Sequence, residues 1–125
     1  MTRMKFREVV RLAEFDRDIV RLARRYPTLE EDLETLINAA VFAFHRLNLD
    51  MGIVQMAGLG QTRLPIFKVR KFACRSLKQR GAHTGLRLIY AFDSENDRVE
   101  LVEIYFKADQ ENEDRTRIKR YYATV

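Results

Sequence analysis

Acidic residues are missing from the whole middle of this 125-residue chain, since none lies between Asp50 and Asp93. That stretch carries eight Lys and Arg residues. Residues 1–50 hold nine cations against nine acids, and residues 93–125 hold six against nine. The formal net charge of +5 therefore comes from one contiguous block. A block of one sign indicates an anionic partner, and nucleic acid is the commonest anionic polymer in a cell.

Other scarce features exclude several classes of protein. Cys74 is the single cysteine, which excludes an internal disulfide. The two histidines, His45 and His83, lie far apart in the sequence, so we predict no metal site and no cofactor. A Gly-rich phosphate loop is missing, because Gly58-Leu59-Gly60 alone is too short a pattern. No apolar run reaches membrane-spanning length and the N-terminus lacks a signal-peptide core, so we expect a cytoplasmic protein without a membrane partner.

The composition is that of a folded domain. Hydrophobic residues make up 46% of the chain and charged residues 33%, which is typical of globular rather than disordered sequences. A chain of 125 residues is long enough to bury one core. We therefore expect a single domain over residues 1–125.

Apolar spacing predicts two helices in the first half of the chain. Apolar residues recur at three and four positions over roughly 14–26, and Pro27 ends that helix. A second helix is predicted over roughly 29–47. Thr28 and Glu31 have the spacing of a capping box at its start. Two helices joined at one proline favour an antiparallel helical hairpin.

The remaining segments are mostly strand-like. A short first strand is predicted over 5–12, and the Gly-containing loop after the helices includes an extended piece at 53–56. Alternating apolar residues predict three further strands, at 64–74, 86–92 and 99–106. A charged helix follows at 112–122, with Asn112 as its cap. We therefore predict an α+β fold: a small antiparallel sheet in the order strand, two-helix hairpin, three strands and C-terminal helix, with the helices packed on one face.

The sharpest local pattern is Phe67-Lys68-Val69-Arg70. Side chains alternate along a strand, so Lys68 and Arg70 share one face. Arg87 on the next strand extends this cationic face, for which the alternative is an ordinary solvated strand surface. Further cations or polar groups of the acid-free block are predicted to bind RNA, namely Arg63, Lys71, Arg75, Lys78, Arg80 and His83.

Cleavage of RNA without a metal needs a base for the 2′-hydroxyl, a cation for the charged phosphorus centre, and an acid for the leaving 5′-oxygen. Arg stabilises charge but stays protonated, whereas the pKa of Lys is lowered by neighbouring cations. Lys68, Arg70 and Arg87 form such a neighbourhood. If the face of Val102, Ile104 and Phe106 packs on the helices, Tyr105 lies on the open face, where it would stack on a base, with Lys107 as a further candidate. The alternative is a tyrosine buried in the core. His45 and Cys74 are interpreted as packing residues, and His83 as an exposed loop residue.

The order of elements, together with the segments Phe67–Arg70, Gly85–Tyr90 and Val102–Lys107, resembles the RelE/ParE superfamily of toxins from type II toxin–antitoxin systems. RelE-like members are ribosome-dependent endoribonucleases that cut mRNA in the A site, and ParE-like members inhibit DNA gyrase. By position, Lys68 and Arg70 match the basic residues of the family's second strand, and Arg87 matches its third-strand arginine. The chain departs from the ribonuclease pattern after Lys107, where it becomes acidic.

The resemblance implies a RelE-like mRNA endoribonuclease that acts without metal through the basic sheet face. Its partners would be a cognate antitoxin protein, mRNA and the ribosome, and the assembly is left open between a homodimer and a toxin–antitoxin hetero-oligomer. A ParE-like gyrase inhibitor, a catalytically silent relative and a plain RNA-binding module are the alternatives. The candidate catalytic residues are Lys68, Arg70, Arg87, Tyr105 and Lys107.

Overall fold

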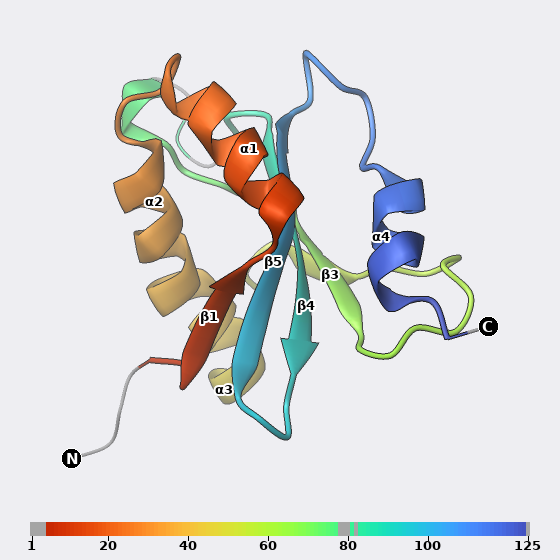
Figure 1. Ribbon diagram of the computed structural model, residues 1–125. Coiled ribbons are helices and arrows are strands. Elements are labelled where there is room, and N and C mark those ends of the chain that lie inside the picture. The colour runs from red at the N-terminus through yellow and green to blue at the C-terminus, as the bar shows by residue number, and fades with distance from the viewer. Residues whose placement is uncertain (1–4, 78–80, 82, 125) are drawn as a thin grey trace.

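The computed structural model describes residues 5–77, 81 and 83–124 (Figure 1). The N-terminal half holds two strands and most of the helices, and the C-terminal half holds the other three strands and the last α-helix. In chain order the elements are β1 (Glu8–Arg11), α1 (Ala13–Ala23), α2 (Leu29–Leu36), the π-helix η1 (Ile37–Val41), α3 (Phe42–Leu47), β2 (Ile53–Gln55), β3 (Ile66–Val69), the 3₁₀ turn η2 (Arg75–Leu77), β4 (Leu86–Asp93), β5 (Arg98–Phe106) and α4 (Arg115–Tyr122).

The sheet has five strands in the order β1-β5-β4-β3-β2. The last four strands in sequence pair antiparallel, each with the next strand along the chain. The predicted α+β class is confirmed. The sheet is mixed rather than wholly antiparallel, however, because the helical hairpin carries the chain across the sheet and β1 runs parallel to β5. The extended piece predicted at 53–56 becomes the edge strand β2.

Both faces of the sheet are covered. The larger core contains the apolar faces of α1, α2 and η1 packed on one face, with Phe15, Leu33 and Leu88 among its most buried members. A smaller core on the other face joins Ile89 of β4 to Ile118 of α4. Figure 1 shows α4 on the far side of the sheet from α1 and α2. The prediction that all helices pack on one face is therefore wrong for α4, whose apolar residues cover the face predicted to be open.

A β-bulge in β5 changes which residues face which core. Ile89 pairs with Glu103 but Tyr90 pairs with Leu101, so Val102 is an extra residue on β5. Leu101 consequently faces the larger core, whereas Val102 lies in the smaller core. Strict alternation predicts one face for Val102, Ile104 and Phe106, and the bulge moves Val102 to the opposite face.

The capping box predicted at the start of α2 is wrong. Thr28 is the N-cap residue, but its side chain makes no capping hydrogen bond. Its hydroxyl instead donates to the Asp32 carboxylate at 2.7 Å and lies 2.8 Å from the Ser76 hydroxyl. The side chain thus joins α2 to the segment after β3, a contact distant in sequence that local spacing cannot predict.

The C-terminal helix begins later than its composition predicts. Asp114 is the cap, in place of Asn112, and its carboxylate accepts the backbone N–H of Arg117 at 3.0 Å. The segment between β5 and α4 therefore passes over one face of the sheet before the helix begins. Its path determines which side chains of that face are covered.

The close approach of Gly85 to Phe106 gives a test of the fold. Gly85 and Gly60 both have positive φ, at +88° and +73°. A Cβ at Gly85 would meet Phe106 Cε2 at 2.8 Å, whereas a Cβ at Gly60 meets nothing within 4 Å. Both alanine variants incur about 1–2 kcal/mol of left-handed strain. We expect Gly85→Ala to lose about 1–3 kcal/mol more unfolding free energy than Gly60→Ala in urea titrations, and equal losses would contradict the register of β4 and β5.

Candidate functional site

The register of three strands brings four polar side chains to the face of the sheet that carries α4. Lys68 of β3 pairs with Ile89, which pairs with Glu103 of β5, and Arg87 of β4 pairs with Tyr105. Alternate residues of a strand share a face. Lys68, Arg87, Glu103 and Tyr105 therefore lie on one face, which we call the cation face. The predicted neighbourhood of Lys68 and Arg87 is present there.

Arg87 is a half-buried cation without a carboxylate partner. Its Nη1 donates to the Leu86 carbonyl at 3.1 Å, and it makes no ion pair with any described residue. The other described arginines that lack an ion pair, which are Arg7, Arg17, Arg24 and Arg70, are all exposed. A partly desolvated guanidinium without a counterion favours binding of an external anion, and its planar fork fits a phosphate.

Lys68 is paired within the chain. Its Nζ lies 3.0 Å from Glu113 Oε2, and the two side chains are 20% and 4% exposed. The second oxygen of Glu113 lies 3.1 Å from an Arg115 nitrogen. Burial alone would raise the pKa of Glu113, but a backbone hydrogen bond, Lys68 and Arg115 together hold it below the usual value. Lys68 thus already has an ionised partner, a contact with an acid that local sequence reasoning missed.

Tyr105 is covered rather than open to solvent. Only 3% of the residue is exposed, because it packs in the smaller core with α4. Burial raises the pKa of its phenol, and the ammonium of Lys68 opposes that rise. The phenol is therefore protonated at neutral pH. The interpretation that places Tyr105 on an open face, ready to stack on a base, is therefore wrong, and the alternative of a buried core tyrosine holds.

A second buried carboxylate holds the segment after β5 against the sheet. Glu103 is 2% exposed. It accepts hydrogen bonds at 2.8 Å from the Gln110 amide nitrogen and from the backbone N–H of Asp114. Burial raises its pKa, and these donors together with Arg117 oppose the rise. Glu103 thereby determines the path of residues 110–114, including the position of Glu113.

The C-terminal helix is held by a buried ion pair with α1. Arg117 Nη1 lies 2.6 Å from Asp18 Oδ2, with the side chains 11% and 5% exposed. The same nitrogen donates to the Val102 carbonyl at 3.0 Å. Asp18 also accepts the backbone N–H of Ile104 at 3.3 Å. The pair therefore satisfies backbone groups at the bulge, and no local motif of the sequence predicts it.

Arg75, a predicted RNA-binding residue, is tied to the helical hairpin. Its Nε lies 2.9 Å from Asp32 Oδ1, its backbone N–H donates to Asp32 Oδ2 at 2.9 Å, and a further nitrogen pairs with Glu31. Burial alone would raise the pKa of Asp32, but hydrogen bonds from Thr28 and Arg75 hold it below the usual value. These contacts anchor the segment after β3, so Arg75 serves the fold in this conformation.

The remaining predicted RNA-binding residues are dispersed. Arg63 stacks over the Tyr122 ring at 4.9 Å and lies 3.8 Å from the Glu100 carboxylate. Lys78 and Arg80 lie outside the described residues. Four of the predicted catalytic and RNA-binding residues are exposed and make no ion pair with any described residue, namely Arg70, Lys71, His83 and Lys107.

The register extends the cation face toward two of these exposed cations. Val69 is the last residue of β3 and pairs with Leu88, so Arg70 follows directly at the end where Arg87 lies. The backbone N–H of Lys107 donates to the Gly85 carbonyl at 2.8 Å, just before β4. Arg70, Arg87 and Lys107 thus gather at one end of the strands, and we call these three residues the cation row.

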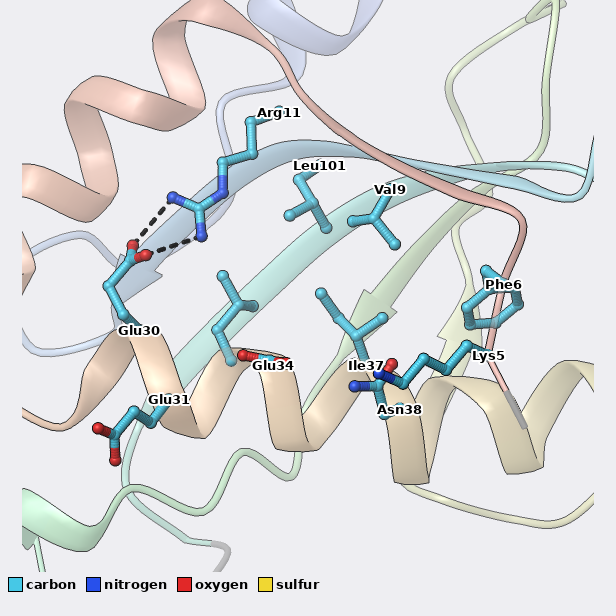
Figure 2. Close-up of a pocket in the computed structure, with 11 residues that line it drawn as sticks. Lys5, Phe6, Val9, Arg11, Glu30, Glu31, Glu34, Ile37, Asn38 and Leu101 are labelled. Atoms are coloured by element: carbon cyan, nitrogen blue, oxygen red, sulfur yellow. Dashed lines mark hydrogen bonds and ion pairs between the residues drawn. The ribbon is translucent and has the colours of Figure 1, made fainter. Parts of the chain in front are cut away.

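A groove lies away from the cation face, between β1 and α2. Figure 2 shows its apolar floor, with Val9, Ile37 and Leu101 between the strand and the helix. Its volume is about 430 Å³. Arg11 closes one end through two hydrogen bonds to Glu30, each 2.9 Å long. A second groove, of about 1040 Å³, is lined by residues of α2, η1 and the segment after β3.

Comparisons with known proteins do not extend these observations. Searches of protein-family models, of curated proteins and of solved structures find no match for this chain. Within residues 5–77, 81 and 83–124, no three or more His, Cys, Asp and Glu side chains gather as metal ligands do. No helix of that part of the chain is long and apolar enough to cross a membrane.

His45 and Cys74 pack in the larger core, as predicted for packing residues. Cys74 is 3% exposed. His45 Nε2 lies 2.7 Å from the Tyr90 hydroxyl, and its ring stacks on Phe92 with centroids 4.1 Å apart. Burial, aided by the charge of Arg46, lowers the pKa of His45 to about 4. The imidazole is therefore neutral at pH 7 and lies on the opposite side of the sheet from the cation face.

The lowered pKa of His45 predicts how stability depends on pH. Between pH 6.5 and about 4 the unfolded chain binds a proton at this histidine and the folded chain does not. The free energy of unfolding should therefore fall as the pH falls through that window. Urea titrations from pH 7 to pH 5 should show this fall in the native chain and in His83→Gln, whose histidine is exposed. His45→Gln should flatten it, and an unchanged slope would contradict the burial of His45.

Proposed function

We propose that this protein is a toxin of the RelE/ParE type that binds mRNA on the ribosome and cleaves it without a metal. The observation that carries the proposal is the half-buried guanidinium of Arg87 on the cation face, which makes no ion pair with any described residue. Support comes also from the order of the elements, since a strand, a helical hairpin and three antiparallel strands are the features on which the resemblance rests.

The cation row supplies phosphate binding in this proposal. Arg87 contacts the scissile phosphate, and Arg70 and Lys107 contact its neighbours along the strand of RNA. In the cleavage step the 2′-oxygen attacks phosphorus, the bond from phosphorus to the 5′-oxygen breaks, and one proton passes from the 2′-hydroxyl to the leaving oxygen. Arg87 stabilises the negative charge that develops on the phosphate oxygens, which is the role that suits a permanently protonated group.

The proposal includes a protein partner and a compartment. A free toxin that cuts mRNA must be neutralised while it is stored, and an antitoxin with an acidic segment would complement the cation row. Ribosomes are its site of action, so the protein works in the cytoplasm. Toxin and antitoxin would form a hetero-oligomer, in which the antitoxin covers the cation row.

Arg87→Ala tests the proposal in cells. Induced synthesis of the native chain should stop growth and fragment mRNA, because the guanidinium stabilises the transition state. Loss of one such donor costs about 10²–10³ in rate, so Arg87→Ala should restore growth and intact transcripts. The measurements are colony formation and transcript end mapping after induction.

The matched control is Arg17→Ala on α1, which removes an exposed arginine that makes no ion pair with any described residue. It should remain as toxic as the native chain. If the native chain leaves growth and mRNA intact, or if both variants behave alike, the proposed ribonuclease is refuted.

A second candidate function is inhibition of DNA gyrase on the same fold, as in the ParE-like branch. The burial of Tyr105 and the pairing of Lys68 favour it, because both remove proton-transfer groups from the cation face. Purified protein would then block supercoiling by gyrase while leaving ribosome-bound mRNA intact. Supercoiling assays beside translation extracts separate the two functions, and cleaved mRNA with normal supercoiling excludes the gyrase target.

A further inference from the structure

We infer that Glu113 is a built-in counterion that withholds Lys68 from nucleic-acid phosphates, so that the native chain binds RNA through the cation row without Lys68. This inference rests on the proposed function for its ligand. It assigns Glu113 as a positioning residue and removes Lys68 from the set of phosphate contacts.

Both oxygens of the Glu113 carboxylate are occupied. Oε2 lies 3.0 Å from Lys68, and Oε1 lies 3.1 Å from an Arg115 nitrogen. Arg115 is itself anchored, because another of its nitrogens donates to the Ala57 carbonyl at 3.1 Å. The carboxylate is therefore held from two sides and is not a mobile surface acid.

The backbone next to Glu113 is also held in place by contacts with the sheet and with α1. Glu103 accepts the backbone N–H of Asp114 at 2.8 Å, directly after Glu113. Asp18 and Arg117 then hold the helix that follows. A side chain with 4% exposure and two cationic partners stands where an incoming phosphate would otherwise meet Lys68.

Competition at Lys68 favours the internal carboxylate. It is ionised at neutral pH, since its pKa is held below the usual value. A phosphate that replaced it would leave a buried carboxylate facing Arg115 alone, and removing one partner from a buried charge pair is strongly unfavourable. The phosphate gains more by binding Arg87, which has no carboxylate to displace among the described residues.

The salt dependence of RNA binding tests this directly, because each phosphate contact adds about 0.7 to the slope of log K against log salt for a single strand. A labelled single-stranded RNA is titrated with the native chain, Lys68→Met, Glu113→Gln and the double variant. We expect equal slopes for the native chain and Lys68→Met. Glu113→Gln should bind more tightly, with a slope steeper by about 0.7, and the double variant should return to the native slope.

Each matched control removes a charge of the same sign from a residue outside the contact between Lys68 and Glu113. Glu111→Gln removes an exposed acid from the same segment, and Lys119→Met removes an exposed lysine from α4. Neither should change the slope. A native slope that falls by about 0.7 in Lys68→Met, or equal slopes for Glu113→Gln and Glu111→Gln, overturns the inference. Loss of mRNA cleavage in Glu113→Gln at unchanged RNA affinity also overturns it, in favour of direct chemistry by Glu113.

Two further measurements keep the outcomes distinct. Circular dichroism and urea midpoints establish that each variant is folded, and the double variant leaves neither charge buried alone. The same proteins are titrated with heparin, a polyanion that requires no RNA-specific fit. If heparin gives the expected pattern of slopes but RNA does not bind, the proposed function is refuted and the counterion role of Glu113 stands. If Lys68→Met changes the slope measured with heparin, the counterion role is refuted.

Discussion

The contact on which the second face of the sheet depends is the buried ion pair between Asp18 and Arg117. Asp18 accepts a hydrogen bond from the backbone N–H of Ile104, where the bulge interrupts the strand pairing, and Arg117 donates one to the Val102 carbonyl. One pair therefore joins α1, β5 and α4. Each partner has one further ion pair, Asp18 with Arg21 at 3.5 Å and Arg117 with Glu14 at 3.3 Å. Removal of either partner would leave the other charge with only that longer contact, which destabilises the fold. The pair determines the position of α4 more than it adds to the net stability. Because α4 lies in that position, Tyr105 is buried.

The charge of this protein is distributed differently in space and in sequence. No acid lies between Asp50 and Asp93, yet acids from outside that block reach into it. Glu113 pairs with Lys68, and Asp32 pairs with Arg75. Among the described cations of that block, Arg70, Lys71 and Arg87 make no ion pair with any described residue, and Arg70 and Arg87 lie at one end of the strands. Surface charges act over roughly a Debye length of about 8–10 Å, so the local field there depends on these pairings more than on the net charge of +5.

Much of the fold follows from periodicity, and the deviations have physical causes. The helical hairpin and the hairpin of β4 and β5 follow from apolar spacing, which reports burial on one face. The parallel pairing of β1 depends on a crossover, and the bulge at Val102 depends on contacts with α1 and α4. Both are long-range, so spacing does not predict them. The shared face of Lys68 and Arg87 follows from alternation, but the partner of Lys68 lies 45 residues away.

The difference between Arg87 and Lys68 then limits what chemistry the cation face can perform. Lys68 is the candidate proton acceptor of the cation face, but its ammonium group already lies 3.0 Å from the buried Glu113 carboxylate. Arg87 binds phosphate and stabilises charge but accepts no proton. Tyr105 is protonated and covered. Under the proposed function the described face would thus supply binding and charge, while the proton acceptor for the 2′-hydroxyl would come from the complex that holds the RNA. A ribonuclease built in this way would be silent toward free RNA and active only where its target supplies the missing group.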